Sequence, residues 1–335
     1  MKPKIVFVVM SAVHSVGAVA ELARALAPHT VLVHHDFIQT PDFEIREPNV
    51  VFVPDPKQTG WAVWGFTDGV FHAMRHAVRH LDFDYLQILS PTCLPIKPIA
   101  ALERHIASGA TEADFSSVDL MHDVDALMSV GYRAFAAEES ILHKILRKMT
   151  LMFFNGSTQR RDVAGVQLRT GGYADSKGRL LPKARLALAV MRLFSVPAIG
   201  RHGFTRAFPP FYGSTWFGAR RHVIEWMLKR FDQPDIQKHF PSKRISDEFL
   251  IATMLKQGGF RSGPTNHCIV SFVEANPTWL SEADFEKLRQ SPAFFARKFP
   301  DDPAAPIRRR VLDELVRVGE RHAEPAPARA ASVLS

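Results

Sequence analysis

The chain has 335 residues, of which 46% are hydrophobic and 23% are charged, as in ordinary soluble globular enzymes. Its two cysteines, Cys93 and Cys268, exclude a disulfide framework, and no apolar run reaches the roughly 20 residues that span a bilayer. The net charge of +8 favours nucleic acid, an anionic membrane surface or a phosphorylated substrate as partner. Because the sequence lacks a recognisable nucleic-acid module, we expect no nucleic acid and keep the other two.

The first predicted element is the apolar run 5–10. It follows Lys2 and Lys4 and superficially resembles a signal peptide. The run is short and leads into an amphipathic helical pattern, which favours a buried first strand instead. We therefore expect a cytoplasmic protein of bacterial type, with peripheral contact to the inner membrane as an option.

The first third of the chain alternates between two apolar periods. Strand-like runs at 5–10, 30–35, 50–53 and 85–89 are separated by stretches with helical spacing, the clearest being 19–26, 71–81 and 99–106. This alternation predicts a Rossmann-like α/β fold, a mostly parallel sheet flanked by helices. Ligands of such sheets bind beyond the carboxyl ends of the strands, where Asp36 follows the second strand.

The middle of the chain is more basic. Segments 140–154 and 181–196 are apolar stretches that contain several lysines and arginines. Basic amphipathic helices often lie on membrane surfaces, and a helical insert packed on the core with its cations in water is the other interpretation. Between them, 155–178 is polar and predicts a mobile loop, and 323–335 is rich in Ala and Pro and predicts disorder.

Two late segments carry reactive groups. Asp247 and Glu248 stand at the start of a helical apolar pattern, and Arg297 and Lys298 follow among phenylalanines. A carboxylate can accept the proton of a sugar hydroxyl, and fixed cations can steady a diphosphate leaving group. Each segment also has a purely structural interpretation. Asp247 and Glu248 fit an ordinary helix start with Ser246 as its cap, and Arg297 and Lys298 fit a basic pair in contact with solvent.

Five segments together carry a family resemblance. They are 31–36 (Val-Leu-Val-His-His-Asp), Trp64-Gly65, 84–97 (Asp-Tyr-Leu-Gln-Ile-Leu-Ser-Pro-Thr-Cys-Leu-Pro-Ile-Lys), 212–217 (Tyr-Gly-Ser-Thr-Trp-Phe), and 246–253 with 296–299. In this order they resemble the core-2/I-branching β-1,6-N-acetylglucosaminyltransferase family, which includes peptide-O-xylosyltransferases. The resemblance implies a GT-A fold, a nucleotide-sugar donor, inversion at the anomeric carbon and no metal requirement.

The resemblance also implies roles for particular residues. Glu248 matches the catalytic carboxylate, and Lys298, with Arg297 beside it, matches the lysine that contacts the diphosphate. A second phosphate-binding cation is expected near 266–268, as His267 or Arg261. The remaining assignments are to the donor site for Asp36, Trp64 and Gly65, and to the acceptor site for Trp216 and Asp247. For either tryptophan, packing in the core is an equal alternative.

Two positions depart from the family pattern. Cys93 stands where the family has an aspartate, and Pro91 where it has a glycine. The identities of donor and acceptor are therefore not carried over beyond a UDP-sugar of the GlcNAc or xylose class.

The resemblance sets the expected domain organisation. We expect one GT-A catalytic domain at 1–300. Within it, about 1–120 would form the nucleotide-sugar half, about 135–200 the basic helical insert and about 200–300 the acceptor and catalytic half. A C-terminal helix and a disordered tail would follow at 301–335.

The leading prediction is an inverting, metal-independent glycosyltransferase without a cofactor. It would move the sugar from a UDP-sugar to a glycan or lipid-linked glycan acceptor in bacterial surface polysaccharide synthesis. Asp123 and Asp125 form an Asp-x-Asp pair, which many GT-A enzymes use to hold a metal ion, and this pair is the main argument against a metal-independent enzyme.

Two other classes of protein remain open. One is a metal-dependent phosphoester hydrolase using His34, His35, Asp36 and the His122-Asp123 pair, although strand alternation places successive side chains on opposite faces. The other is a non-catalytic, membrane-peripheral scaffold of a polysaccharide assembly complex.

Overall fold

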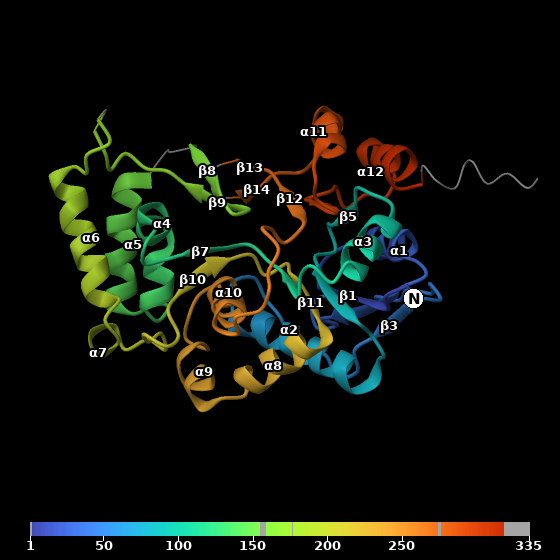
Figure 1. Cartoon of the computed structure of the whole chain (residues 1–335), viewed down its shortest axis with the longest axis horizontal. Coiled ribbons are helices and arrows are strands. Elements are labelled where there is room, and N and C mark those ends of the chain that lie inside the picture. Colours follow the sequence, from blue (N-terminus) through green and yellow to red (C-terminus); the bar gives the residue numbers. More distant parts are fainter. Residues whose placement is uncertain (1, 155–158, 176, 274–275, 318–335) are drawn as a thin grey trace, which may run out of the picture.

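The computed structural model describes residues 2–154, 159–175, 177–273 and 276–317 (Figure 1). The chain is a mixed α/β protein built on a six-stranded, mostly parallel sheet in the order β3-β2-β1-β4-β11-β6. The strands of this sheet are β1 Ile5–Ser11, β2 Thr30–His35, β3 Val50–Phe52, β4 Tyr85–Leu89, β6 Ala113–Asp114 and β11 Gly218–Arg220. The first four strands in this order are parallel, β11 is antiparallel to β4, and β6 is antiparallel to β11. The predicted α/β class with a mostly parallel sheet is confirmed.

Helices cover both faces of this sheet. Along β1, Val6 and Val8 belong to one buried apolar cluster, and Phe7 and Val9 belong to another. The first cluster includes residues of α2 Trp64–His80, α4 Val124–Phe135, α8 Arg221–Phe231 and α10 Asp247–Gln257. The second includes residues of α1 Val16–Ala25, α3 Ile99–Ala107, α11 Phe285–Gln290 and α12 Pro306–Val311. A strand covered on both faces needs apolar side chains at every position, which explains the continuous apolar run 5–10.

The strand order reverses between β1 and β4. In open α/β sheets this switch point opens a crevice beyond the carboxyl ends of the strands. Here a small sheet of β5 Leu94–Pro95, β15 Phe295–Arg297 and β12 Cys268–Val270 lies next to that end. The chain after β15 is tied to both strand ends, since Phe299 N donates to Thr92 O (2.9 Å) and Ser15 N donates to Asp301 Oδ2 (2.7 Å).

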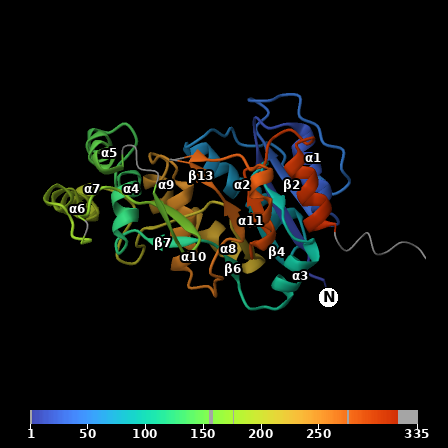
Figure 2. The ribbon, with the colours of Figure 1, turned by 90° about the horizontal axis from the view of Figure 1, so that it is seen from above.

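A helical lobe extends to one side of the sheet (Figures 1 and 2). It contains α4, α5 Ile141–Phe154, α6 Pro182–Phe194 and α7 Pro197–Gly200. No helix among the described residues is long and apolar enough to cross a bilayer.

Between α5 and α6 the loop prediction was wrong. The strands β8 Arg160–Val163 and β9 Val166–Arg169 form an antiparallel hairpin there. Its two-residue turn is Ala164-Gly165, with φ of 49° and 77°. Positive φ at both turn residues matches the right-handed strand twist, and glycine adopts it without strain. Residues 155–158 and 176 lie outside the described part of this segment.

Other boundaries also differ from expectation. The helix predicted at 71–81 begins at Trp64, and the chain after β6 forms a separate strand, β7 Ser117–Asp119, paired with β10 Phe211–Gly213. The remaining short elements are α9 Pro234–His239, β13 Phe272–Val273, β14 Asn276–Pro277 and a 3₁₀ turn Glu282–Asp284. A helix at the C-terminal end is present as α12 with a π-helical turn, Leu312–Val316. The tail 323–335 lies outside the described residues.

Candidate functional site

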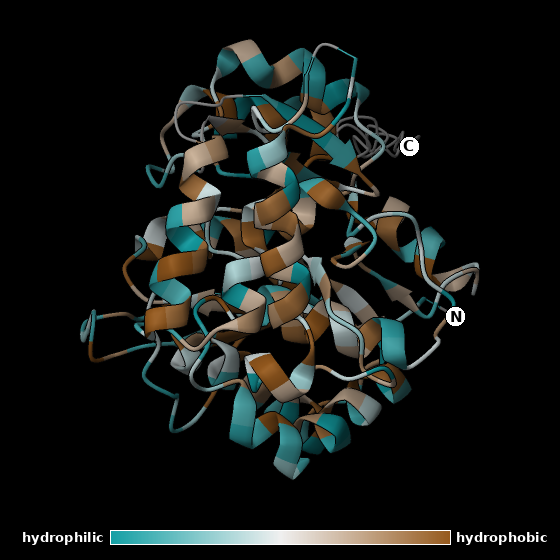
Figure 3. Cartoon of the chain, turned by 90° about the vertical axis from the view of Figure 1, so that its left-hand side faces the viewer, coloured by the Kyte–Doolittle hydropathy of each residue, from teal (hydrophilic) through white to brown (hydrophobic). Residues whose placement is uncertain are grey.

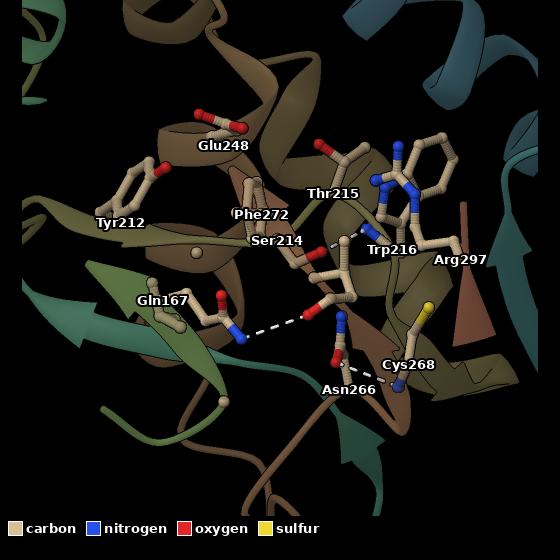
Figure 4. Close-up of a pocket in the computed structure, with 14 residues that line it drawn as sticks. Gln167, Tyr212, Ser214, Thr215, Trp216, Glu248, Asn266, Cys268, Phe272 and Arg297 are labelled. Carbon is tan, nitrogen blue, oxygen red and sulfur yellow. Dashed lines mark hydrogen bonds between the residues drawn. The ribbon is translucent and has the colours of Figure 1, made fainter. Parts of the chain in front are cut away.

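A pocket of about 590 Å³, including its open mouth, lies at the start of α10 (Figure 4). Residues from β9, β10, the 214–216 turn, α10, β12 and β15 line it. The pocket therefore brings together segments that are up to 132 positions apart in the sequence, from Gly165 to Arg297. Its enclosed part measures about 100 Å³, less than the roughly 300–1,000 Å³ of small-molecule sites, so a ligand held there would extend out through the open mouth.

Three of the predicted site residues line this pocket: Glu248, Trp216 and Arg297. The guanidinium carbon of Arg297 lies 5.0 Å from the centroid of the Trp216 ring, and Figure 4 shows the two side chains against each other. Arg297 Nε is buried and has no hydrogen-bond partner. A guanidinium held by an aromatic face but with a free donor is suited to bind an anionic group.

Glu248 has the environment of a general base. Its side chain is 29% exposed, and Arg133 Nη1 on α4 lies 3.3 Å from Glu248 Oε2. Burial raises the pKa of Glu248 to about 7. The charge of Asp247 adds to this rise, and Arg133, a hydrogen bond from Tyr212 and Arg297 oppose it. A carboxyl group with a pKa near neutral can both accept and release a proton at physiological pH.

Asp247 supports the pocket from behind. It is 6% exposed, does not line the cavity, and accepts a hydrogen bond from Thr215 Oγ1. Burial raises the pKa of Asp247, and the Thr215 bond opposes that rise. Asp247 therefore holds the 214–216 turn, which carries Trp216, and the expected cap bond of Ser246 is replaced by a contact of its Oγ with Thr67 Oγ1 (2.9 Å).

Lys298 lies next to the pocket lining, at the switch point of the sheet. Its Nζ is 4.0 Å from the Trp279 ring centroid. Burial and the Arg297 charge lower the pKa of Lys298. His14, just beyond β1, lies 3.4 Å from Asp301, and its pKa is lowered by burial, with contributions from both cations. Positive charge therefore gathers at the carboxyl end of β1.

The predicted donor residues Asp36, Trp64 and Gly65 lie outside the pocket lining. Asp36 is 1% exposed and accepts hydrogen bonds from Thr59 N and Gln39 Nε2, both at 2.7 Å. Burial alone would raise the pKa of Asp36, but these bonds lower it. Trp64 stacks on Phe231 (5.5 Å, 9°), as core packing predicts.

Gly65 has a steric role at the start of α2. A Cβ there would come within 2.4 Å of Gln58 O, so only glycine allows the preceding loop to approach the helix so closely. In this structure Asp36, Trp64 and Gly65 shape the loop over the β2 end of the sheet.

Cys93 is fully buried against Cys268 and close to Arg297. Burial by itself would raise the pKa of the Cys93 thiol, but a hydrogen bond from Cys268 and the Arg297 charge lower it to about 7. A partly ionised thiol here can supply negative charge near Arg297, as an aspartate would.

The expected metal ligands do not converge. His34 accepts from Lys57 N (3.0 Å), whereas His35 stacks on Phe43 (3.8 Å between centroids), so the two imidazoles face different neighbours. Asp123 and Asp125 do approach a common point, but it is the guanidinium of Arg161.

Among the described residues, one group of three has metal-ligand spacing: His105, Asp114 and His267. His267 therefore faces Asp114 and not a phosphate site. Arg261 lies on an exposed loop beside Glu112, 4.0 Å away, so neither candidate for the second phosphate-binding cation reaches the pocket.

Sequence reasoning missed several pocket residues. It also missed Arg133, which contacts Glu248 from outside the pocket lining and whose helix contains no motif that distinguishes it from other arginines. Gln167 was missed because the hairpin was predicted as a loop, whereas Tyr212 and Asn266 lay in segments already singled out. No protein-family model matches the chain, and no curated protein matches its sequence.

Proposed function

We propose that this protein is an inverting glycosyltransferase that moves a sugar from a UDP-sugar to a glycan hydroxyl. The observation that carries this proposal is a carboxyl group of near-neutral pKa, Glu248, in one pocket with an aromatic-backed cation, Arg297. The first can activate a weak nucleophile, and the second can bind a phosphate group.

The reaction is a single displacement. Glu248 takes the proton of the acceptor hydroxyl while that oxygen forms a bond to the anomeric carbon. The bond from the anomeric carbon to the diphosphate oxygen breaks, and its electron pair leaves with the nucleoside diphosphate. Arg297 and Lys298 stabilise the charge that develops on the phosphate oxygens, which is the role a metal ion plays elsewhere. Attack opposite the leaving group inverts the anomeric configuration.

The arrangement of the sheet supports a GT-A fold. The four parallel strands reverse order between β1 and β4, and nucleotides bind at such a switch point. Arg297 and Lys298 are held there by the contacts of 299–301 with Thr92 and Ser15. On this proposal 1–300 is one catalytic domain, whose first 120 residues bind the nucleotide and whose segment 200–300 supplies the base.

We also propose that the acceptor is lipid-linked and that the helical lobe lies on an anionic membrane. The lobe carries nine of the sixteen large apolar side chains that are exposed in the described part of the chain. They are Ile141, Ile145, Leu151, Met152, Leu181, Leu186, Leu193, Val196 and Ile199. Figure 3 views the molecule from this side and shows brown and teal residues interspersed along the helices.

The charge of these helices indicates what covers them. Together α5 and α6 carry the exposed cations Lys144, Arg147, Lys148, Lys183, Arg185 and Arg192 and no acidic residue. A second copy of the lobe would place like charges opposite each other, which is unfavourable, whereas anionic lipid complements them. The β8–β9 hairpin between α5 and α6 lines the pocket through Gly165, Val166 and Gln167, so a lipid-anchored glycan could reach Glu248.

The transferase proposal is tested by binding and by turnover. Calorimetry with UDP, GDP and their sugars, with and without EDTA, should find one UDP-sugar that binds in both conditions. Glu248→Gln should then lower transfer by about 10²–10⁴-fold and leave donor affinity unchanged. Glu225→Gln, a half-buried acid on α8 that also pairs with an arginine, is the matched control.

Two outcomes would contradict the proposal. If Glu248→Gln transferred the sugar within a few-fold of the wild-type rate, Glu248 would not be the general base. If no nucleotide sugar bound, the alternative of a non-catalytic, membrane-peripheral scaffold would be favoured.

The membrane proposal is tested by flotation on phosphatidylcholine vesicles with and without about one-third phosphatidylglycerol. Wild type should float only with the anionic vesicles. A double variant with Ile145→Asp and Leu186→Asp should not float. The control Ile38→Asp, which is more exposed than either residue but lies outside the lobe, should float like wild type. If the lobe variant floated as well as the Ile38→Asp control, the assignment of the lobe as a membrane-binding surface would be wrong.

A further inference from the structure

Outside the pocket, three side chains from distant parts of the chain meet at one point. His105 lies on α3, Asp114 ends β6, and His267 directly precedes β12. One ligand atom from each lies within 4.8 Å of the others.

Two of these atoms are left without hydrogen bonds. Asp114 is 0% exposed, and its Oδ1 has no hydrogen-bond partner. His267 Nε2 lies 3.3 Å from this oxygen and also has no partner, so the two atoms are close but not aligned to bond each other. Buried polar atoms are rarely left unpaired, because each loses its interaction with water. A cation between them would satisfy both.

The other oxygen of Asp114 fixes the carboxylate in place. Tyr85 OH donates to Asp114 Oδ2 at 2.6 Å, and His105 Nε2 is hydrogen-bonded to the same atom at 2.9 Å, a bond that it would exchange for one to a metal ion. A Cβ on Gly263 would come within 2.5 Å of Oδ1, so the glycine keeps the side of the free oxygen open. A hydrogen-bonded carboxylate with one oriented, unpaired oxygen is typical of a metal ligand and its outer partner.

We propose that His105, Asp114 and His267 bind one divalent first-row transition metal ion, with Zn²⁺ as the best fit. Two imidazole nitrogens and one carboxylate oxygen are ligands of this class and not of Mg²⁺ or Ca²⁺, which take oxygen ligands. Ligand atoms about 2.0–2.1 Å from a tetrahedral ion are roughly 3.3 Å apart, the spacing between Asp114 and His267. The His105 side chain is 21% exposed, which leaves access for a water molecule as fourth ligand.

The ion would fasten the wall of the pocket. Asn266 and Cys268 line the pocket on either side of His267, and Phe294 packs against both imidazole rings (5.5 and 4.7 Å between centroids). Binding at this point would tie the 261–267 loop to α3 and β6. None of its ligands lines the pocket, so the ion supports the site and takes no part in the reaction.

The experiment measures metal in the full-length protein. Protein purified without chelator is analysed by inductively coupled plasma mass spectrometry, stripped, and titrated with Zn²⁺ while its thermal unfolding is followed. Wild type should hold one equivalent of metal, and its melting temperature should rise with Zn²⁺. His267→Gln and His105→Gln should lose the metal, whereas His122→Gln should keep it. His122 is a suitable control because it also lies 2.9 Å from a carboxylate, that of Asp119, but is 86% exposed and has no third ligand.

A positioning variant completes the test. Tyr85→Phe keeps all three ligands and should weaken Zn²⁺ binding by about 10–100-fold. The proposal is overturned if folded wild type neither contains nor is stabilised by metal, or if His267→Gln and His122→Gln retain it equally. Metal content is independent of the transferase proposal, since Glu248→Gln should abolish transfer and keep the metal.

Discussion

Glu248 and Asp114 are two carboxyl groups in opposite electrostatic states, although burial alone would raise the pKa of both. Asp114 accepts hydrogen bonds from Tyr85 and His105 and lies 3.3 Å from His267, and these neighbours hold its pKa well below the usual range. Glu248 has fewer donors and opens into a pocket, so its pKa rises to about 7. At Asp114 the hydrogen-bonding neighbours outweigh burial, whereas at Glu248 burial and the charge of Asp247 outweigh the neighbouring donors.

Asp36 follows the same rule as Asp114. It is as buried as the core, but hydrogen bonds from Gln39, Thr59 and Ile38 lower its pKa. Of the carboxylates singled out from the sequence, Glu248 is the one that lines the pocket with a near-neutral pKa.

The largest effect that separates the two carboxyl groups is on stability. Asp114→Asn should destabilise the fold by about 3 kcal/mol, because it leaves buried donors without their anion. The melting temperature should fall by about 4 °C, at roughly 1.4 °C per kcal/mol for a chain of 335 residues. Thermal unfolding by circular dichroism measures this, with Asp82→Asn on the exposed surface as a control that should change little. Equal melting temperatures for Asp114→Asn and wild type would break the comparison.

The second effect is on the pH dependence of the transfer rate. Because a base must be unprotonated, kcat/KM for transfer should fall about tenfold per pH unit below the pKa of Glu248, about 7, and level off above it. Initial rates between about pH 5 and 9 at constant ionic strength measure this profile. A rate independent of pH down to about pH 5 would show that the group does not titrate as the base.

The third effect is that of Arg133 on the pKa of Glu248. Arg133 lowers the pKa of this carboxyl group, so Arg133→Gln should raise it further and move the acidic limb of the pH profile upward by about one unit. Arg147→Gln, on the exposed side of α5, should leave the profile in place. A shift of the same size in both variants would assign the effect to the charge of the whole lobe.

The smallest effect is a gain in stability. The folded-state pKa of Glu248 lies above its ordinary value of 4.5, so the stability from the bound proton is full below about pH 4.5 and is lost as pH rises through about 7. Glu248→Gln has no such loss. Its melting temperature should exceed that of wild type by about 2 °C or more at pH 8, and the difference should shrink towards pH 5. A variant less stable than wild type at pH 8 would mean that the charged form is favoured in the fold.

Local sequence patterns determined the covered sheet and the position of Glu248 at the start of a helix. The run 5–10 is apolar at every position because β1 is covered on both faces. A continuous apolar run without polar alternation is enough to predict such a strand. Glu248 could be placed at a helix start because the apolar pattern begins there. The hairpin at 160–169 was missed because its turn, Ala164-Gly165, is flanked by mostly polar and basic residues without a strong strand pattern.

Tertiary structure alone decided which groups meet. Arg133 reaches Glu248 across 115 positions of sequence, and His267 reaches Asp114 across 153, so no local pattern could pair them. The same packing gave His267 a buried carboxylate as neighbour and placed Trp64 on Phe231 in the core. The pKa of an acidic side chain depends on donors and charges gathered from the whole fold, and so the sequence could name Glu248 but not its protonation.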